Sequence, residues 1–221
     1  MTDTVRYPLV LGLISLCSAA SLAFSYALTR DEIRRQQQLD KDRGLAAVFG
    51  MEFNEKDKER PWQEVPGPGQ EAGAGQPVFA ATEPTTGRAL YAATGSARGY
   101  SSRVEIIVAV DQGVKDSSPA AKIKAISVVA QSETPGLGDK CRAPEFQKQF
   151  SDLLLGRLEL KKGVPYRVPG QADGDQQDIA AITGATITSN AVLSAVRQAI
   201  ERIRERAAQA AGGGPAESRK P

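Results

Sequence analysis

The feature that most limits how this chain can fold is an apolar stretch near its N-terminus. Residues Tyr7–Leu28 contain no Asp, Glu, Lys or Arg and read YPLVLGLISLCSAASLAFSYAL. About 20 helical residues are enough to span the hydrocarbon core of a bilayer. The sequence therefore predicts a transmembrane anchor at 7–28, preceded by a short N-terminal tail at 1–6.

Two other interpretations of this stretch stay open. A cleaved signal peptide usually has a shorter apolar core and more positive charge in front than the single Arg6, although Ser25-Tyr26-Ala27 resembles a cleavage site. A lipoprotein signal needs a small residue before its cysteine, whereas Leu16 precedes Cys17 here. Both comparisons favour an uncleaved anchor that crosses the membrane once.

Composition narrows the chemistry available to the rest of the chain. The 221 residues are 41% hydrophobic and 24% charged, which suffices for one core of ordinary size with appendages. The chain has no histidine, and its two cysteines, Cys17 and Cys141, cannot form a zinc site by themselves, so we predict neither a metal site nor a catalytic residue. The net charge of +2 and the lack of a basic block interleaved with aromatic residues give little support to nucleic-acid binding. A protein this poor in reactive side chains must use an organic cofactor if it transfers electrons.

Hydropathy and turn signals divide the remainder of the chain. They predict a helical connector at 29–60, a Pro/Gly-rich loop at 61–76, a folded domain at 77–208 and a disordered tail at 209–221. Within the domain, the expected strands are Val78–Thr82, Ala89–Thr94, Val104–Val110 and Ile123–Ala130, with a helix after Ala143. Several strands in sequence with few helices indicate an α+β fold with an antiparallel sheet and flanking helices.

A threonine-rich turn before the last helix is the strongest candidate for a binding site. The segment reads Ile-Thr-Gly-Ala-Thr-Ile-Thr-Ser over residues 182–189 and leads into an amphipathic stretch, which Thr188 or Ser189 can cap. The free N–H groups and positive dipole end of a helix N-terminus favour a phosphate, and Thr186 lies at that point. The alternative is a capped strand-to-helix connection in which Gly184 relieves the backbone.

A second segment, taken together with this turn, points to a known family of domains. Residues Glu133–Gly138 read Glu-Thr-Pro-Gly-Leu-Gly and follow a β-type run, although a Pro-Gly turn with a packing leucine would look the same. Together with the Thr-Gly-Ala-Thr segment at 183–186, it resembles the FMN-binding domain shared by the G subunit of the Rnf electron-transport complex and the C subunit of the sodium-pumping quinone reductase. The resemblance covers about Gln76–Arg206 plus the membrane helix, and it is stronger to the Rnf member.

The resemblance implies a covalently bound FMN, joined through its phosphate to Thr186. It also implies that the nearby turn and the Glu-Thr-Pro-Gly-Leu-Gly segment surround the flavin, with Glu133 accepting a hydrogen bond. Tyr100, in a Gly-Tyr loop of the family, either stacks on the flavin ring or is an ordinary surface aromatic residue. The other expected FMN-binding residues are Thr183, Gly184, Ala185, Thr188, Ser189, Thr134, Gly136 and Leu137.

Four residues depart from the family pattern. Ala180 stands where an acidic residue is usual, with Asp178 two residues earlier, which puts recognition by a flavin transferase in question. Gln131 replaces a frequent histidine. Ser101 and Ser102 follow Gly99-Tyr100 where glycine is common.

By resemblance, the chain is an electron-carrier subunit of an ion-translocating ferredoxin:NAD oxidoreductase rather than a stand-alone enzyme. Its partners would be the other subunits of a membrane complex and a flavin transferase that attaches the FMN. A membrane-anchored flavin reductase with non-covalent flavin and a flavin-free scaffold with the same fold remain the alternatives.

Two arguments disagree about which side of the membrane the domain occupies. Arg30, Arg34 and Arg35 follow the anchor, against Arg6 before it, and the positive-inside rule would keep the domain in the cytoplasm. The family places its flavin domain on the periplasmic side of the bacterial inner membrane. Long C-terminal domains translocate largely regardless of flanking charge, so we expect the periplasmic location.

Overall fold

A computed structural model describes residues 3–56, 60–65, 77–111, 121–155, 158–161 and 178–212. Contacts divide the chain into two units, Met1–Asp40 and Lys41–Pro221, and each is described by itself. The tail was expected to begin at 209, but the last helix continues to Gly212. The rest of that tail at 213–221, the loop residues 66–76 and the connection at 112–120 lie outside the described residues.

The first unit consists of the N-terminal part of one long helix, α1 (Asp3–Phe49). From Tyr7 onward this helix is long and apolar enough to cross a membrane. The side chains of Tyr7–Leu28 are exposed, which suits a helix that faces lipid rather than a protein core. The helix ends at Phe49, within the connector that was expected to be helical to residue 60. Gly50 follows it with a φ of 68°, the left-handed conformation typical of a helix C-terminus.

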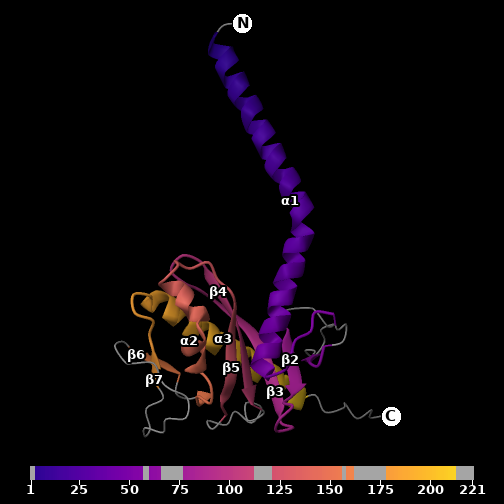
Figure 1. Cartoon of the computed structure of the whole chain (residues 1–221), viewed down its shortest axis with the longest axis vertical. Coiled ribbons are helices and arrows are strands. Elements are labelled where there is room, and N and C mark those ends of the chain that lie inside the picture. The colour runs from indigo at the N-terminus through magenta and orange to yellow at the C-terminus, as the bar shows by residue number, and fades with distance from the viewer. Residues whose placement is uncertain are drawn as a thin grey trace, which may run out of the picture. The chain divides into compact units, whose positions relative to one another are not determined.

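The second unit is built on a five-stranded antiparallel sheet whose strands follow their order in the chain (Figure 1). Each strand pairs with the next one along the chain, as expected for strands that follow one another directly. The strands are β1 (Gln63–Val65), β2 (Val78–Thr82), β3 (Ala89–Arg98), β4 (Arg103–Asp111) and β5 (Ile123–Ala130). The predicted α+β fold with an antiparallel sheet is confirmed, and β5 has the predicted bounds.

The prediction that the Pro/Gly-rich loop begins at residue 61 is wrong. Gln63–Val65 forms β1, which pairs with β2, and Trp62 is buried beside Phe49 with the two rings 6.3 Å apart. The prolines and glycines at 66–69 made the whole segment look like a loop. The short edge strand just before them could not be recognised from composition.

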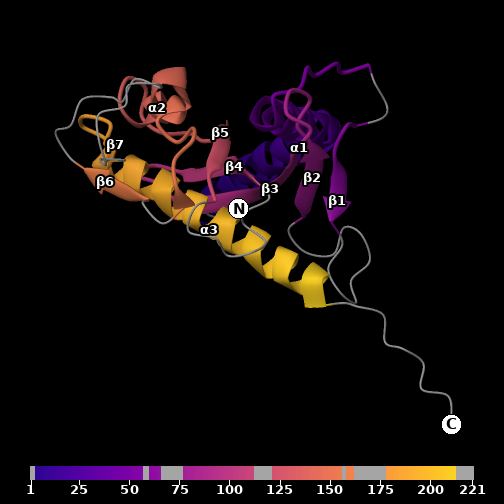
Figure 2. The ribbon, with the colours of Figure 1, turned by 90° about the horizontal axis from the view of Figure 1, so that it is seen from below.

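The remaining elements follow β5 and cover one face of the sheet. The domain ends in α3 (Thr186–Gly212), which lies along the strands in Figure 2. The helix predicted after Ala143 is only five residues long, and the chain then turns back, so that Leu153 and Leu155 bond to the chain around the start of β5. The short elements are the 3-10 helix η2 (Gly138–Arg142), α2 (Pro144–Lys148) and the parallel pair β6 (Glu159–Lys161) and β7 (Asp178–Ala180).

Both faces of the sheet are buried, which explains why its central strands read as continuous Val/Ile runs. Along β4, Val104, Ile106 and Val108 belong to the core under α3, whereas Ile107 and Ala109 belong to a second core on the opposite face. The second core is completed by the end of α1, where the residues expected to pack are buried: Leu45, Val48 and Phe49.

The backbone of α3 lies very close to the sheet at Gly95 in β3. A Cβ atom at this position would lie 1.9 Å from the Ala195 carbonyl oxygen of α3. On either side, the Ser96 N–H donates to Gln198 Oε1 (2.9 Å) and the Arg202 guanidinium donates to the Thr94 carbonyl. Glycine is thus required for α3 to lie flat on β3, and this contact sets where the first turn of the helix falls.

We predict that Gly95→Ala destabilises the domain by at least about 2 kcal/mol, because the added methyl group collides with helix backbone that cannot move aside. Urea unfolding of the full chain in detergent, followed by Trp62 fluorescence, measures this loss. Gly12→Ala makes the same change where a Cβ meets nothing within 4 Å, and the stability of the domain should not change. Equal midpoints for Gly95→Ala and wild type would show that α3 does not pack this closely.

Candidate functional site

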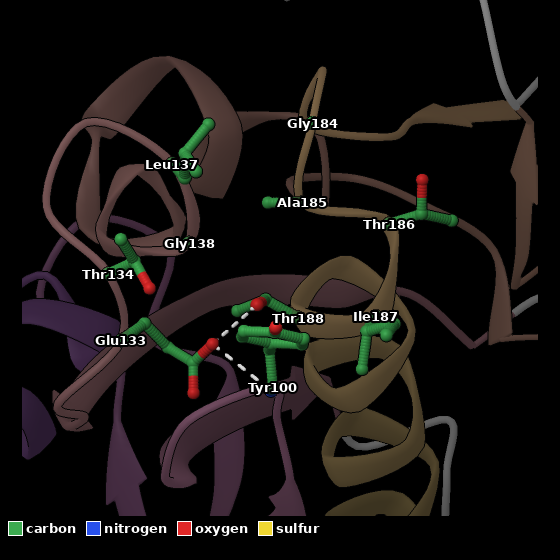
Figure 3. Close-up of a pocket in the computed structure, with 10 residues that line it drawn as sticks. All are labelled: Tyr100, Glu133, Thr134, Leu137, Gly138, Gly184, Ala185, Thr186, Ile187 and Thr188. Carbon is green, nitrogen blue, oxygen red and sulfur yellow. Dashed lines mark hydrogen bonds between the residues drawn. The ribbon is translucent and has the colours of Figure 1, made fainter.

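One cavity of about 460 Å³ lies where three segments distant in the sequence meet (Figure 3). The segments are the loop between β3 and β4, the segment between β5 and η2, and the turn that leads into α3. The residues that line the cavity are Tyr100, Glu133, Thr134, Leu137, Gly138, Gly184, Ala185, Thr186, Ile187 and Thr188. Its volume lies within the range of about 300–1,000 Å³ typical of small-molecule sites.

The segment after β5 forms a Pro-Gly turn, the local structure given above as the alternative interpretation of its sequence. The Leu137 N–H donates to the Thr134 carbonyl at 3.2 Å, and Gly136 has a φ of 78°. Proline at the second position and glycine with positive φ at the third are the signature of a type II turn. The turn holds Leu137 at the cavity with 44% of its surface exposed.

The turn into α3 is tighter than the sequence predicted. Gly184 has a φ of 78°, and the Ala185 carbonyl accepts the first helical bond, from the Ser189 N–H at 3.0 Å. Ala185 is therefore the N-cap residue, and Thr186 is the first residue of the helix rather than a residue of the preceding turn.

The prediction that Thr188 or Ser189 caps this helix is wrong. Ser189 is fully buried; its Oγ accepts from the Ile182 N–H and donates to the Ala185 carbonyl, both at 3.0 Å. It thus ties the strand-to-helix turn together from inside. The Thr188 hydroxyl points instead to Glu133, across the cavity wall.

Glu133 is the central polar group of the site. Its Oε1 accepts from the N–H groups of Ser101 (3.1 Å) and Ser102 (2.8 Å) and from the Ser102 hydroxyl (3.1 Å). Its Oε2 accepts from the Tyr100 N–H (3.1 Å) and from the Thr188 hydroxyl (2.6 Å). Three successive backbone N–H groups that converge on one anion form a nest, and here the anion is a side chain of the protein itself.

The ionisation of Glu133 reflects this environment. Burial, with only 6% of the residue exposed, works to raise its pKa by disfavouring the charged form. Hydrogen bonds from Thr188, Ser102 and Ser101 outweigh burial and leave the pKa of Glu133 below its usual value. The carboxyl group is therefore ionised at neutral pH.

Two glycines make room for this carboxylate. A Cβ on Gly99 would lie 2.5 Å from Glu133 Oε1, and a Cβ on Gly138 would lie 2.8 Å from both Glu133 Cβ and Thr188 Oγ1. Gly138 was not predicted as a site residue. It is the last glycine of the Glu-Thr-Pro-Gly-Leu-Gly run, and its place in that run could have indicated its role.

The three threonines of the turn have different environments. Thr183 is exposed and does not line the cavity, and Thr188 is buried with its hydroxyl hydrogen donated to Glu133. Thr186 is half-buried and lines the cavity (Figure 3). Within the described residues, its hydroxyl makes no hydrogen bond to another protein group.

Apolar side chains gather at the mouth of the cavity. Tyr100 is 70% exposed, Ile187 55% and Leu137 44%. Outside α1, these three are the exposed large hydrophobic residues of the described part of the chain. An apolar mouth over a polar floor suits a ligand with a large flat ring and a charged tail.

Eight of the eleven residues predicted for the site line this cavity. They are Tyr100, Glu133, Thr134, Leu137, Gly184, Ala185, Thr186 and Thr188. Thr183, Gly136 and Ser189 belong to the adjoining turns and do not line it, and Ile187 was missed although it follows Thr186 directly. The role of all these residues as FMN ligands remains a prediction.

The departures from the family pattern have local explanations. Ser102 supplies two of the five bonds to Glu133, and its Oγ also accepts from the Ser132 N–H at 2.8 Å. Gln131 Oε1 accepts from the Glu133 N–H at 2.6 Å. Ala180 is buried, and its N–H donates to Gln149 Oε1 at 2.8 Å, so an acidic side chain here would point into the protein and not to solvent.

The thiol of Cys141 does not line the cavity. Burial raises the pKa of the Cys141 thiol to about 11, which keeps it protonated and unreactive at neutral pH. Among the described residues, no group of three or more His, Cys, Asp or Glu side chains is placed to hold a metal ion.

Comparison with known proteins identifies the class of this site. Residues 99–201, which contain every wall of the cavity, match the family model described as FMN-binding domain. The solved structure of the C subunit of the Na(+)-translocating NADH-quinone reductase from Parabacteroides distasonis superposes with a TM-score of 0.55, covering 79% of this chain and 95% of that one. Its sequence identity of 19% supports the shared fold alone. The fold and the site thus define an FMN-binding domain.

Two curated relatives specify the family. The G subunit of the ion-translocating oxidoreductase complex of Aliivibrio fischeri is 32% identical over 205 residues, covering 90% of each chain. The G subunit of the proton-translocating ferredoxin:NAD(+) oxidoreductase complex of Clostridium ljungdahlii is 33% identical over 113 residues, about half of each chain (51% and 52%). The chain belongs to the family of G subunits of ion-translocating oxidoreductase complexes. The resemblance inferred from the two motifs is confirmed, and the apolar helix makes the chain a membrane-anchored protein.

Because the pKa of Glu133 is lowered on folding, its contribution to stability should be present above the ordinary value of 4.5 and lost as the pH falls through the lower folded-state value. We predict that the free energy of unfolding falls more steeply on acidification in wild type than in Glu133→Gln. Urea titrations from about pH 7 to pH 3 measure both slopes. Parallel curves would mean that the folded state does not depend on the ionised Glu133.

Proposed function

We propose that this chain is the FMN-carrying electron-transfer subunit of a membrane-bound, ion-translocating ferredoxin:NAD oxidoreductase complex, and that FMN is esterified through its phosphate to Thr186. The names of the two G-subunit relatives support the kind of complex, and the FMN-binding domain match supports the cofactor. The other subunits of that complex would be its partners. The covalent link rests on the environment of Thr186.

The residues present fit an FMN molecule. The cavity is large enough for a cofactor of this class, and its mouth carries the apolar side chains that a flavin ring requires. At the other side, the first turn of α3 directs its free N–H groups and positive dipole end toward the place where a phosphate would sit. Tyr100, Leu137 and Ile187 would contact the ring, and the start of α3 would hold the phosphate.

The observation that carries the proposal is the difference among the three threonines. Thr188 cannot serve, because its hydroxyl is buried and committed to Glu133, and Thr183 does not line the cavity. Thr186 combines a hydroxyl without a protein partner among the described residues, a place in the cavity wall and the first position of a helix. A phosphoester at this position keeps its negative charge beside the helix dipole.

The attachment reaction needs an activated donor, because the phosphate of free FMN has no good leaving group. A flavin dinucleotide has one in its pyrophosphate bond. Thr186 Oγ1 would attack the flavin-side phosphorus; the new O–P bond forms as the pyrophosphate bond breaks, the nucleoside monophosphate leaves, and the hydroxyl proton passes to solvent. A separate flavin transferase would catalyse this step, because the carboxylate that lines the cavity, Glu133, accepts five hydrogen bonds from other groups and none from Thr186.

Covalent attachment suits an electron carrier. A tethered cofactor is held at a high effective concentration and cannot dissociate between turnovers. When bound, FMN supplies reversible electron acceptance and donation, which none of the side chains that line this cavity can provide. The walls of the cavity hold the ring in one place, and the membrane helix keeps the domain beside its partner subunits.

We also propose that the domain faces the periplasmic side of a bacterial inner membrane, with α1 as its only membrane span. The length of the domain supports translocation despite the arginines that follow the anchor, since positive charge orients mainly short segments.

The Thr186 assignment predicts a specific loss of flavin. The full chain, produced with its flavin transferase and denatured in SDS, should give a flavin-fluorescent gel band. Thr186→Val should abolish the fluorescence, because it removes the hydroxyl at nearly constant volume. Thr183→Val makes the same change three residues earlier and should leave the band bright.

The other outcomes distinguish the alternatives. Fluorescence that survives Thr186→Val would overturn the attachment site. A dark wild-type band from a protein that is yellow before denaturation would indicate non-covalent flavin. A chain that is colourless throughout would indicate a flavin-free scaffold.

The orientation predicts that protease added to spheroplasts digests the domain without lysis. A cytoplasmic protein followed in the same sample should remain intact, which shows that the inner membrane is sealed. Protection of the domain in sealed spheroplasts, followed by digestion after detergent, would place it in the cytoplasm and contradict the proposal.

A further inference from the structure

The carboxylate of Glu133 has hydrogen-bond partners in both of the other walls of the cavity. Its carboxylate accepts from the β3–β4 loop through Tyr100, Ser101 and Ser102, and from α3 through Thr188. Its backbone belongs to the third wall, the segment between β5 and η2 (Figure 3). The three walls, which are more than 30 residues apart in sequence, are thus joined through one side chain.

All the hydrogen-bond acceptor sites of the Glu133 carboxylate are taken by groups of the protein. Two carboxylate oxygens offer roughly four lone-pair sites, and Glu133 accepts five hydrogen bonds. It therefore has no capacity left for the hydrogen bond to a flavin that the sequence predicted for it. Its action on a ligand must pass through the groups that it holds and through its charge.

The charge of Glu133 is isolated. No Lys or Arg of the described residues forms a salt bridge with it; its partners are three N–H groups and two hydroxyls. Dipoles stabilise a buried anion without cancelling its net charge, so its field persists in the cavity that the residue lines. The lowered pKa of Glu133 is consistent with this arrangement.

From this geometry we propose that Glu133 is a positioning residue with two separable effects. Its five hydrogen bonds order the walls of the cavity, and its fixed negative charge lowers the reduction potential of a flavin bound there. The second effect rests on the proposed function. The first does not, because it concerns contacts within the protein alone.

Two substitutions separate the bonds from the charge. Glu133→Gln keeps the length of the side chain but removes the charge, and its amide cannot accept from the Tyr100 N–H through the nitrogen. Glu133→Asp keeps the charge but is one methylene shorter, so it cannot reach all five donors. Glu145→Gln is the matched control, because Glu145 is an exposed acid in α2 outside the cavity.

The ordering effect is measured on the flavin-free chain by hydrogen exchange of the amides of Tyr100, Ser101 and Ser102. Glu133→Asp should exchange about tenfold faster or more at these three amides, and Glu133→Gln should do so at Tyr100, because each variant loses acceptors for those N–H groups. Glu145→Gln should match wild type. Unchanged protection in both Glu133 variants would overturn the ordering effect.

The charge effect is measured by the midpoint potential of the bound flavin in the full chain. Glu133→Gln should raise the potential, whereas Glu133→Asp and Glu145→Gln should leave it close to wild type. A potential that moves equally in Glu133→Gln and Glu133→Asp, or in neither, would overturn the charge effect.

Two further results keep the test decisive. If wild type carries no flavin, the proposed function fails while hydrogen exchange still decides the ordering effect. If Glu133→Gln does not fold, Thr188→Val removes one donor to the carboxylate and keeps the charge. It should then loosen the start of α3 and leave the potential unchanged, and the opposite pattern would contradict the proposal.

Discussion

A buried carboxylate surrounded by backbone amides is the interaction on which the cavity depends. Burying Glu133 would be costly on its own, and the N–H groups of Tyr100–Ser102 offset that cost by donating hydrogen bonds to its carboxylate. Because the donors and the acceptor come from different segments, the segments adopt one arrangement instead of several independent ones. The glycines at 99 and 138 follow from the same requirement, because any side chain there would occupy the space of the carboxylate.

The sheet and α3 form the frame that brings these loops together. Gly95 lets α3 lie against the backbone of β3, and this contact determines where the first turn of α3 meets Glu133. Thr186 is therefore placed by long-range packing as well as by its own turn. The exposed apolar residues of the cavity then lie beside a helix N-terminus, which favours an anion.

Features specified by nearby residues could be predicted from the sequence. The Ile/Val run of β5 is local, and the strand has the predicted bounds. The Pro-Gly turn at 135–136 is also local and is the turn that the alternative interpretation of that segment described. The cap of α3 could not be predicted, since Ser189 bonds back to Ile182 and the hydroxyl of Thr188 is taken by a residue 55 positions away. The number of hydrogen bonds to Glu133 could not be predicted for the same reason. Its role as an acceptor was predicted, but its donors include residues of a loop more than 30 positions away in the sequence.

The central claim is that Thr186 carries FMN as a phosphoester, and peptide mass spectrometry tests it most directly. Trypsin should release residues 168–197 as one peptide from protein purified from membranes under denaturing conditions. The account predicts a mass increase equal to FMN less one water, with fragment ions that place the adduct on Thr186. An unmodified peptide from flavin-containing protein, or an adduct on Thr183 or Thr188, would contradict it.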